Sequence, residues 1–428
     1  MVEMVQADGR TQVCVFNEGT WACHDRALIN GHDVVPYSPH NNLIRHRVVL
    51  FPSEPAEYGS VSDLVAEVRA FIHRYVDVSP VFETVATYYV LLSWVYDAFN
   101  ELPYLRVRGD FGSGKTRFLL TVGSLCYKPI FASGASTVSP LFRILDAFQG
   151  TLVLDESDFR LSDERAEIVK ILNNGTARGF PVLRSEVNGK HEYDPRAYTV
   201  YGPKVIGTRG LFQDRALESR CITEDLGFRS VRQDIPLSLP SVFQAQALEI
   251  RNKLLLYRFR NRHRLGDLTG TIDRELEPRI SQIFAPLLAV IEDEQDIADV
   301  RDLARASSRQ VMQDRGMDVE AQVLEVLHDL VSKSPSKALP LRDVAVAFSQ
   351  RFGDESDWRA SPRWIGGVLR RRLQLRPCKS HGAYVLPITE CLKLKRLFER
   401  YGITSTEAEH APVDEGDVVD GEGSGLRP

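Results

Sequence analysis

The chain has 428 residues, 43% of them hydrophobic and 26% charged, so it is too long for one compact core and two or three domains are expected. Its formal net charge is −5, but residues 404–428 hold seven acids and one base, which leaves the rest of the chain close to neutral. The most apolar run, residues 84–96, is thirteen residues long. It is too short to span a bilayer and is expected to form a buried helix.

The cysteines and the chain ends add further expectations. The six cysteines form neither a C-x-x-C pair nor a metal-ligand spacing, which favours a reduced, cytoplasmic protein. The first eight residues contain no basic segment followed by an apolar one, so neither a secretion signal nor a membrane partner is expected. Residues 403–428 lack aromatic side chains and a hydrophobic period, which is typical of a disordered acidic tail.

Residues 1–75 carry no recognisable chemistry, and their role stays open. Alternating runs at 12–16 and 47–51 predict short strands, and the apolar spacing over 62–74 and 80–100 predicts helices. We expect these helices to pack beside the domain that follows.

A phosphate-binding loop is expected at residues 109–116, which match G-x-x-x-x-G-K-[ST] at every fixed position. A short apolar strand, 104–108, precedes the loop, and an apolar helix opens at 118–122. Backbone N–H groups and the helix N-terminus attract phosphate oxygens. Lys115 is expected at the β- and γ-phosphates and Thr116 at Mg²⁺. The candidate ATP-binding residues are Gly109, Gly112, Ser113, Gly114, Lys115 and Thr116.

A second signal lies about forty residues after the loop, where the apolar run 150–156 ends in Asp155 and Glu156. This is the form of a Walker B strand. Asp155 is expected to hold Mg²⁺, and Glu156 is expected to act as general base toward the attacking water. Alone, such a run also fits an ordinary capped strand, but its position after a complete phosphate loop favours the catalytic interpretation. A strand at 129–133 and a helix at 140–148 are expected in between.

A β-hairpin is expected around Asn188 and Gly189, the pair best suited to a two-residue type I′ turn. Residues 181–187 and 191–193 flank the pair, and Lys190 and His191 directly follow it. From these residues alone, a surface hairpin with incidental charges is the simpler interpretation.

Further polar residues follow in order. Residues 204–208 predict a core strand with Thr208 at its carboxyl end, the end that faces the ligand crevice in an open α/β sheet. About a dozen residues on, 214–222 include Arg220. A basic amphipathic helix is expected at 243–264, and residues 277–283, with Arg279, open another helix.

Together these segments resemble the AAA+ ATPase core, and more narrowly the MCM-like helicases of mobile genetic elements. The resemblance covers residues 80–235 and the C-terminal domain in outline. It is carried by the phosphate loop, Asp155-Glu156-Ser157-Asp158, the hairpin, Val205 to Thr208, and Ala216-Leu217-Glu218-Ser219-Arg220.

The resemblance implies roles for particular residues. The hairpin would project into a central pore and bring Lys190 and His191 to single-stranded DNA. Arg220 would be an arginine finger supplied to the neighbouring subunit. Thr208 occupies the sensor 1 position, where Asn is usual, and Arg279 is similar to a sensor 2 arginine at the γ-phosphate, a solvated charge being the alternative. The large DNA-binding N-terminal domain of MCM proteins has no counterpart here.

The C-terminal segment 335–402 predicts a winged helix. Helices are expected at 341–352 and 361–373, with wing strands at 375–376 and 383–386. Residues 337–402 hold fourteen Lys or Arg against six acids, which favours a polyanionic partner. Candidate duplex-DNA contacts are Arg370, Arg371 and Arg372. A protein-contact winged helix and a solvated basic face are the alternatives.

The sequence therefore predicts an α/β protein with a P-loop AAA+ core and a parallel sheet flanked by helices at 76–235. A helical lid and linker at 236–334 and the winged helix complete it. The expected function is an ATP- and Mg²⁺-dependent DNA helicase or translocase that forms a homo-oligomeric ring, a hexamer, in the replication of a plasmid, phage or integrated element. The alternatives are a nucleotide-switched DNA-binding initiator or regulator that does not unwind DNA, and a AAA+ machine that acts on protein.

Overall fold

The computed structural model describes residues 1–134, 136–155, 163–187, 193–227, 232–316, 319–334, 337–352, 360–380 and 382–403, with the backbone alone for 163–166 and 313–316. The chain divides into two compact units, Met1–Ser308 and Arg309–Pro428. Each unit has its own sheet and its own core, and each is described by itself.

A five-stranded parallel sheet forms the centre of the larger unit. Its strand order is β12 (Cys221–Asp225), β6 (Tyr104–Arg108), β11 (Lys204–Thr208), β8 (Leu152–Asp155) and β7 (Ile130–Ser133). Every residue of β11 is buried, as are the first four of β6, which is the pattern of a parallel sheet covered on both faces. β6 and β11 have the bounds predicted from the sequence.

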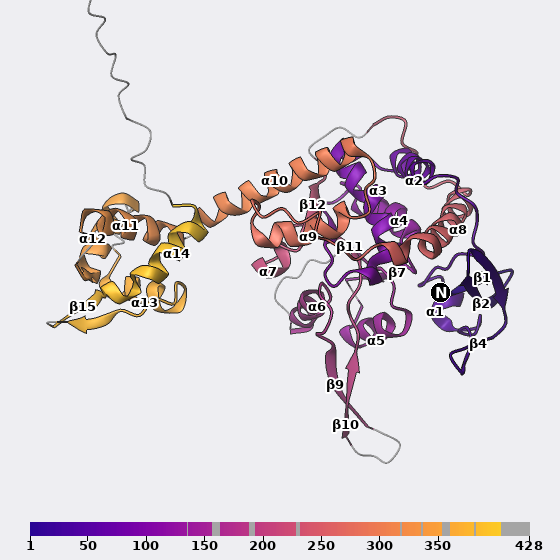
Figure 1. Ribbon diagram of the computed structural model, residues 1–428, viewed down its shortest axis with the longest axis horizontal. Coiled ribbons are helices and arrows are strands. Elements are labelled where there is room, and N and C mark those ends of the chain that lie inside the picture. The colour runs from indigo at the N-terminus through magenta and orange to yellow at the C-terminus, as the bar shows by residue number, and fades with distance from the viewer. Residues whose placement is uncertain are drawn as a thin grey trace, which may run out of the picture. The chain divides into compact units, whose positions relative to one another are not determined.

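Helices cover the two faces of this sheet (Figure 1). Successive residues of β8 face opposite helical layers. Leu152 and Leu154 join a hydrophobic cluster with α5 (Val138–Phe148) and α6 (Asp163–Asn174). Val153 faces Gly123 of α4 (Lys115–Leu125), which has no room for a side chain there. The alternation follows from the period of two in a strand, and it fixes α4 directly above the end of β8.

The apolar run at 84–96 is a buried helix, as predicted. It forms most of α3 (Pro80–Val95), which starts at the N-cap Ser79 and packs against α4 and α8 (Phe243–Asn261). None of the helices in the described part of the chain is both long and apolar enough to cross a membrane. The other elements of this unit are α1 (Asn42–Arg45), α2 (Val61–Tyr75), η1 (Tyr96–Ala98), α7 (Arg215–Glu218), η2 (Arg262–Arg264), α9 (Pro278–Leu288) and α10 (Glu294–Gly316), whose last residues belong to the smaller unit.

The N-terminal strands belong to the larger unit. They form a sheet of β1 (Val2–Ala7), β2 (Arg10–Asn17) and β3 (Thr20–His24) and a small hairpin of β4 (Ala27–Ile29) and β5 (His32–Val34). The strand predicted at 47–51 is wrong: this segment is a loop that makes one isolated bridge, from Val49 to Ile130. Val49 and Phe51 are buried in the hydrophobic cluster that includes residues of α5 and β7, but the segment forms no ladder.

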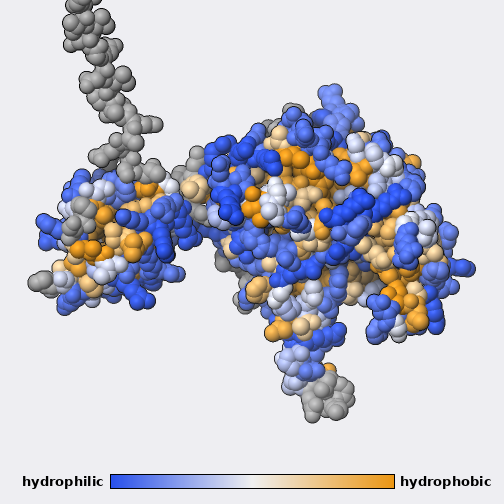
Figure 2. All heavy atoms as spheres, in the orientation of Figure 1, coloured by the Kyte–Doolittle hydropathy of each residue, from blue (hydrophilic) through white to orange (hydrophobic). Residues whose placement is uncertain are grey.

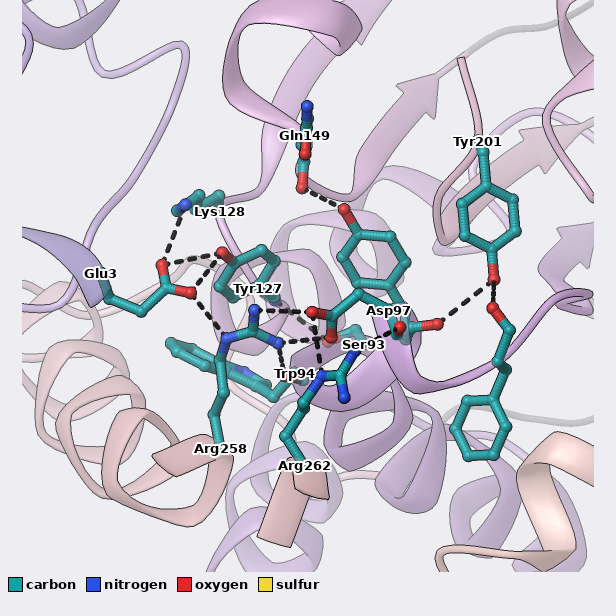
Figure 3. Close-up of polar contacts among 12 residues, drawn as sticks. Glu3, Ser93, Trp94, Asp97, Tyr127, Lys128, Gln149, Tyr201, Arg258 and Arg262 are labelled. Atoms are coloured by element: carbon teal, nitrogen blue, oxygen red, sulfur yellow. Dashed lines mark hydrogen bonds and ion pairs between the residues drawn. The ribbon is translucent and has the colours of Figure 1, made fainter. Parts of the chain in front are cut away.

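A buried polar network fastens β1 to the helices (Figure 3). The carboxylate of Glu3 accepts bonds from Arg258 of α8 at 2.7 Å, Lys128 at 2.9 Å and Tyr127 at 2.8 Å. Arg258 in turn contacts Asp97 at 2.7 Å. Burial raises the pKa of Glu3, but the Lys128 and Arg258 charges outweigh that effect and lower it to about 2. The network thereby joins Glu3 of the N-terminal strand to Arg258 of α8, 255 residues later in the chain.

The hairpin expected around Asn188 is present and projects from the body of the unit (Figure 1). It pairs β9 (Val182–Val187) with β10 (Tyr193–Tyr198), and Val187 lies opposite Tyr193. Five residues therefore separate the paired strands, so the register predicted from a two-residue turn at Asn188 and Gly189 is wrong. The second strand is longer than predicted and runs through Pro195, while the turn lies outside the described residues.

The smaller unit has its own hydrophobic core beneath a three-stranded sheet. Its elements are α11 (Val319–Lys333), β13 (Leu339–Pro340), α12 (Leu341–Phe352), α13 (Pro362–Arg371), β14 (Cys378–Ser380), β15 (Ala383–Leu386), η3 (Ile388–Glu390) and α14 (Cys391–Tyr401), with sheet order β13-β15-β14. The strand predicted at 375–376 is wrong, because Leu375 is buried in the core and pairing begins at Cys378. Hydrophilic residues follow the outer edge of this unit (Figure 2).

Candidate nucleotide-binding site

The loop between β6 and α4 has the backbone that a phosphate-binding loop requires. A Cβ atom at Gly109 would lie 2.7 Å from both the Leu226 carbonyl and the Ser113 hydroxyl, so only glycine fits there. Gly112 and Gly114 have φ angles of 74° and 95°, a region that side chains other than glycine rarely enter. The loop therefore turns tightly into the N-terminus of α4, which begins at Lys115.

Lys115 is folded onto its own loop. Its Nζ donates to the carbonyl oxygens of Gly109 at 2.6 Å and Asp110 at 2.7 Å, and its side chain is largely buried. Both acceptors are uncharged carbonyl groups, so neither bond places a counter-ion beside the ammonium group. The loop thus holds a cation where phosphate oxygens are expected.

Thr116 and Asp155 come together across two elements. The Thr116 hydroxyl, in the first turn of α4, donates to Asp155 Oδ2 at the end of β8 at 2.7 Å. Gly207 of β11 lies beside this contact, where a Cβ atom would be 3.4 Å from Asp155 Oδ1, an ordinary distance, and a tighter 3.0 Å from a Leu119 methyl. The structure therefore joins the two sequence motifs into one site, while Glu156 lies outside the described residues.

Two buried hydroxyls beside the loop have no hydrogen-bond partner among the described residues: Ser113 Oγ and Thr208 Oγ1. Thr208 is 2% exposed, and its carbonyl accepts a bond from the Gly109 N–H at 3.1 Å. A buried hydroxyl without a partner is costly. Both groups would be satisfied by a ligand with several oxygen acceptors held in the loop.

Sequence reasoning missed one residue at the loop. The Arg209 guanidinium, which follows Thr208, lies 3.6 Å from the centre of the exposed Phe111 ring. The stacking places a second cation next to the phosphate loop. Nothing in the local sequence pattern marks this contact, because it depends on β11 lying next to β6 in the sheet.

Arg220 and Arg279 lie near the amino-terminal ends of the sheet strands, opposite the end that carries the phosphate loop. The carbonyl of Arg220, the residue before β12, accepts from the Tyr104 N–H at the start of β6, whereas the phosphate loop follows the end of β6. Because β6 has five residues, its two ends are roughly 15 Å apart. Arg279 shares a cavity of about 230 Å³ with Arg220, next to Leu102. Neither arginine is positioned to reach the phosphate loop of its own chain, and the expected contact of Arg279 with a γ-phosphate stays a prediction.

Both guanidinium groups bond to side-chain amides, and neither contacts a carboxylate among the described residues. Arg220 Nη1 donates to the Asn173 side-chain oxygen at 2.6 Å, and Arg279 Nη1 to the Gln282 side-chain oxygen at 2.7 Å. Burial, and then the Arg279 charge, lower the pKa of Arg220. The acids that could have paired with Arg220 are engaged elsewhere: Glu218 binds Arg106, and Asp225 binds Arg108.

The hairpin has two unlike faces. Leu183, Val187 and Tyr193 are exposed on one face. The other carries a charged network in which Glu186 contacts Arg143 at 2.6 Å and Arg196 at 3.6 Å. Lys190 and His191, the predicted DNA contacts, lie outside the described residues.

The candidate DNA contacts of the smaller unit lie at the end of α13. Arg370 and Arg371 are exposed, while Ile365 and Leu369 of the same helix are buried. Arg372 differs from them because its Nη1 contacts Glu320 of α11 at 3.3 Å. All three predicted arginines are thus exposed, and Arg372 is also paired with a carboxylate.

No family model and no curated protein matches the chain. Among solved structures, it is similar to the NrS-1 C-terminal region, with 11% identity, a TM-score of 0.35, and coverage of 90% of this chain and 96% of that one. It is also similar to SCCmec type IV Cch, described as an active helicase, with 12% identity, a TM-score of 0.38, and coverage of 79% and 72%. A third is the Drosophila ORC bound to DNA, with 12% identity, a TM-score of 0.19, and coverage of 81% and 96%.

Proposed function

We propose that this chain is an AAA+ ATPase that binds ATP and Mg²⁺ at the phosphate loop, assembles into a ring and uses hydrolysis to move along or open DNA. The observation that carries the proposal is the 2.7 Å contact between the Thr116 hydroxyl and Asp155. It joins the end of the phosphate loop to the acidic end of β8, and oxygen ligands of this kind are those that Mg²⁺ prefers.

The loop residues fit a nucleotide with its metal. Lys115 and the backbone of residues 109–114 would hold the phosphates, and Thr116 and Asp155 would hold Mg²⁺. When bound, Mg²⁺ neutralises charge on the β- and γ-phosphates. The unpartnered hydroxyls of Ser113 and Thr208 support a ligand rich in oxygen acceptors. Glu156 is the proposed general base, since it follows Asp155 directly in the chain.

The placement of Arg220 and Arg279 favours a site shared between subunits. Both lie at the sheet edge opposite the loop and have amide rather than carboxylate partners. Their charges would therefore serve the phosphate loop of a neighbouring copy, and repetition of this head-to-tail contact closes a ring. We assign Arg220 as the arginine finger and Arg279 as a second cation at the same interface. A hexamer is the expected ring.

DNA is the proposed track. Lys190 and His191, which lie between β9 and β10 in the sequence, would contact single-stranded DNA in the pore. The smaller unit, with three strands and exposed Arg370 and Arg371 on α13, is proposed to be a winged helix that holds duplex DNA. The proposed setting is replication of a plasmid, phage or integrated element.

ATP hydrolysis measured with and without single-stranded DNA tests the proposal. The account predicts Mg²⁺-dependent turnover that single-stranded DNA stimulates, and ATP-dependent separation of a forked duplex. Stimulation without strand separation would indicate the initiator or regulator instead. Turnover that DNA leaves unchanged would favour a machine acting on protein, and absence of turnover would contradict the ATPase assignment.

A further inference from the structure

Asn173, the second-last residue of α6, accepts one hydrogen bond and donates another. Its side-chain oxygen accepts from Arg220 Nη1 at 2.6 Å, and its side-chain nitrogen donates to Asp214 Oδ2 at 2.7 Å. A side-chain amide carries both a hydrogen-bond acceptor, its oxygen, and a donor, its nitrogen. Both bonds are satisfied by a single orientation of the amide, so the residue type is matched to its place.

The two partners of Asn173, Asp214 and Arg220, lie at the two ends of residues 214–220. Asp214 caps α7, since its Oδ1 accepts from the Ala216 and Leu217 N–H groups at 2.8 and 3.3 Å. α7 leads through Ser219 into Arg220, whose carbonyl is fixed by the Tyr104 N–H at 2.9 Å. Asn173 therefore contacts residues 214–220 at both ends, through Asp214 at the start and through the Arg220 guanidinium at the end.

The end of α6 is also fastened to the segment that leaves the hairpin. The carbonyl of Gly175 accepts from the Gly202 N–H at 3.2 Å and from the buried Lys204 Nζ at 3.4 Å. Lys204 Nζ also donates to the carbonyls of Val200 and Gly202, each at 3.0 Å. A Cβ atom at Gly175 would lie 2.4 Å from Lys204 Nζ and 2.7 Å from the Val200 carbonyl, so the contact is tight.

We infer that Asn173 is a positioning residue that sets Arg220 for the neighbouring subunit's ATP site and links its position to the hairpin. The inference rests on the proposed function. Hydrogen bonds join residues 200–202, which follow β10, to Lys204 and Gly175, the backbone leads from Gly175 back to Asn173 two residues earlier, and Asn173 binds Arg220. A force applied to the hairpin is therefore transmitted to the end of α6, and it displaces the Arg220 side chain.

The first test is Asn173→Ala, with Asn174→Ala as the matched control on the same helix. Loss of a hydrogen bond to a charged group corresponds to roughly 10- to 100-fold, so we expect basal hydrolysis to fall by about that factor and stimulation by single-stranded DNA to disappear. Asn174→Ala should retain both. Normal hydrolysis and normal stimulation in Asn173→Ala would overturn the inference.

Mixing experiments separate a positioning role from a defect within the chain's own site. Asn173→Ala has an intact phosphate loop, and Lys115→Ala has an intact Arg220, so their mixture should hydrolyse ATP faster than the sum of the two proteins alone. A mixture of Asn173→Ala with Arg220→Ala should show no such gain, because neither protein supplies a well-placed arginine. A gain in neither mixture would overturn the inference.

Two controls keep the result interpretable. Thermal unfolding of Asn173→Ala identifies a folding defect, and Asn173→Asp, which keeps the oxygen that accepts from Arg220 but removes the donor to Asp214, is then the second variant, judged by the same mixtures. Failure of the proposed function is visible separately, because the unmodified protein would then hydrolyse no ATP or Arg220→Ala would be fully active.

Discussion

The Thr116 hydroxyl donates a hydrogen bond to Asp155 Oδ2 at 2.7 Å, which joins the first turn of α4 to the end of β8. This pair predicts the effect of losing the metal ligand. Thr116→Val should weaken ATP binding about 10-fold or more in Mg²⁺ but much less in excess chelator, since the hydroxyl acts on the metal rather than on the phosphates. Equilibrium titration of nucleotide under both conditions measures this.

The control is the same substitution one and a half turns further along α4. Thr121 is buried, and its hydroxyl has no partner among the described residues, so Thr121→Val should leave nucleotide binding unchanged. Equal loss in the two variants would mean that packing of α4, and not the metal, accounts for the effect.

Glu156→Gln separates binding from hydrolysis. The change removes the proposed base while leaving Lys115, Thr116 and Asp155 in place, so ATP affinity should be kept while turnover falls by about 100-fold or more. Lys115→Ala should lose affinity as well as turnover. Unchanged turnover in Glu156→Gln would remove this residue from its proposed role.

The paired state of Arg372 distinguishes the three basic residues of the smaller unit. Arg370→Ala and Arg371→Ala should each weaken duplex DNA binding and flatten its salt dependence by about one unit of the log–log slope, because each phosphate contact releases a counterion. Arg372→Ala should have a smaller effect, since Arg372 already contacts Glu320. Binding isotherms at several salt concentrations measure both quantities. Equal effects of all three changes would contradict this division.

The hairpin is expected to act on DNA rather than on nucleotide. Replacing both Lys190 and His191 with Ala should abolish separation of a forked duplex while basal hydrolysis survives, because these residues are distant in sequence from the phosphate loop. Normal unwinding by the double variant would return them to the simpler interpretation, incidental charges on a surface hairpin.

The Glu3 network predicts how stability depends on pH. Because the folded state lowers the pKa of Glu3 from 4.5 to about 2, its contribution is complete above pH 5 and is lost as the pH falls toward 2. That contribution is on the order of 3 kcal/mol. Glu3→Gln should unfold more readily at pH 7 and show a flatter pH dependence between 5 and 2, whereas Glu18→Gln, in an exposed turn, should behave like the unmodified protein.

The sequence located elements whose signal is local. The glycine pattern of residues 109–116 and the apolar runs of β6 and β11 were sufficient to predict the loop and both strands. The turn requires glycine and burial requires apolar residues, so both are visible in the sequence itself. β12 was missed because its sequence, Cys-Ile-Thr-Glu-Asp, has one buried hydrophobic residue, Ile222, and ends in acids that bind other elements.

The parts of the site that depend on strand order could not be predicted. Asn173 meets Arg220 only because α6 ends beside the start of β12, and Arg209 meets Phe111 only because β11 lies next to β6. The expectation that Arg279 reaches the γ-phosphate came from resemblance. The structure puts it beside Arg220, away from the loop of its own chain, so a contact with the γ-phosphate of a neighbouring copy stays a prediction.

The central claim is that each ATP site is completed by the neighbouring subunit, and one measurement tests it most directly. Lys115→Ala and Arg220→Ala proteins are each expected to be inactive, since an arginine finger is worth about 10³ to 10⁵ in rate. In a 1:1 mixture, about a quarter of the interfaces pair an intact loop with an intact arginine, so hydrolysis should recover toward that fraction of the unmodified rate. A mixture that stays inactive, although affinity capture shows that mixed rings form, would contradict the shared site.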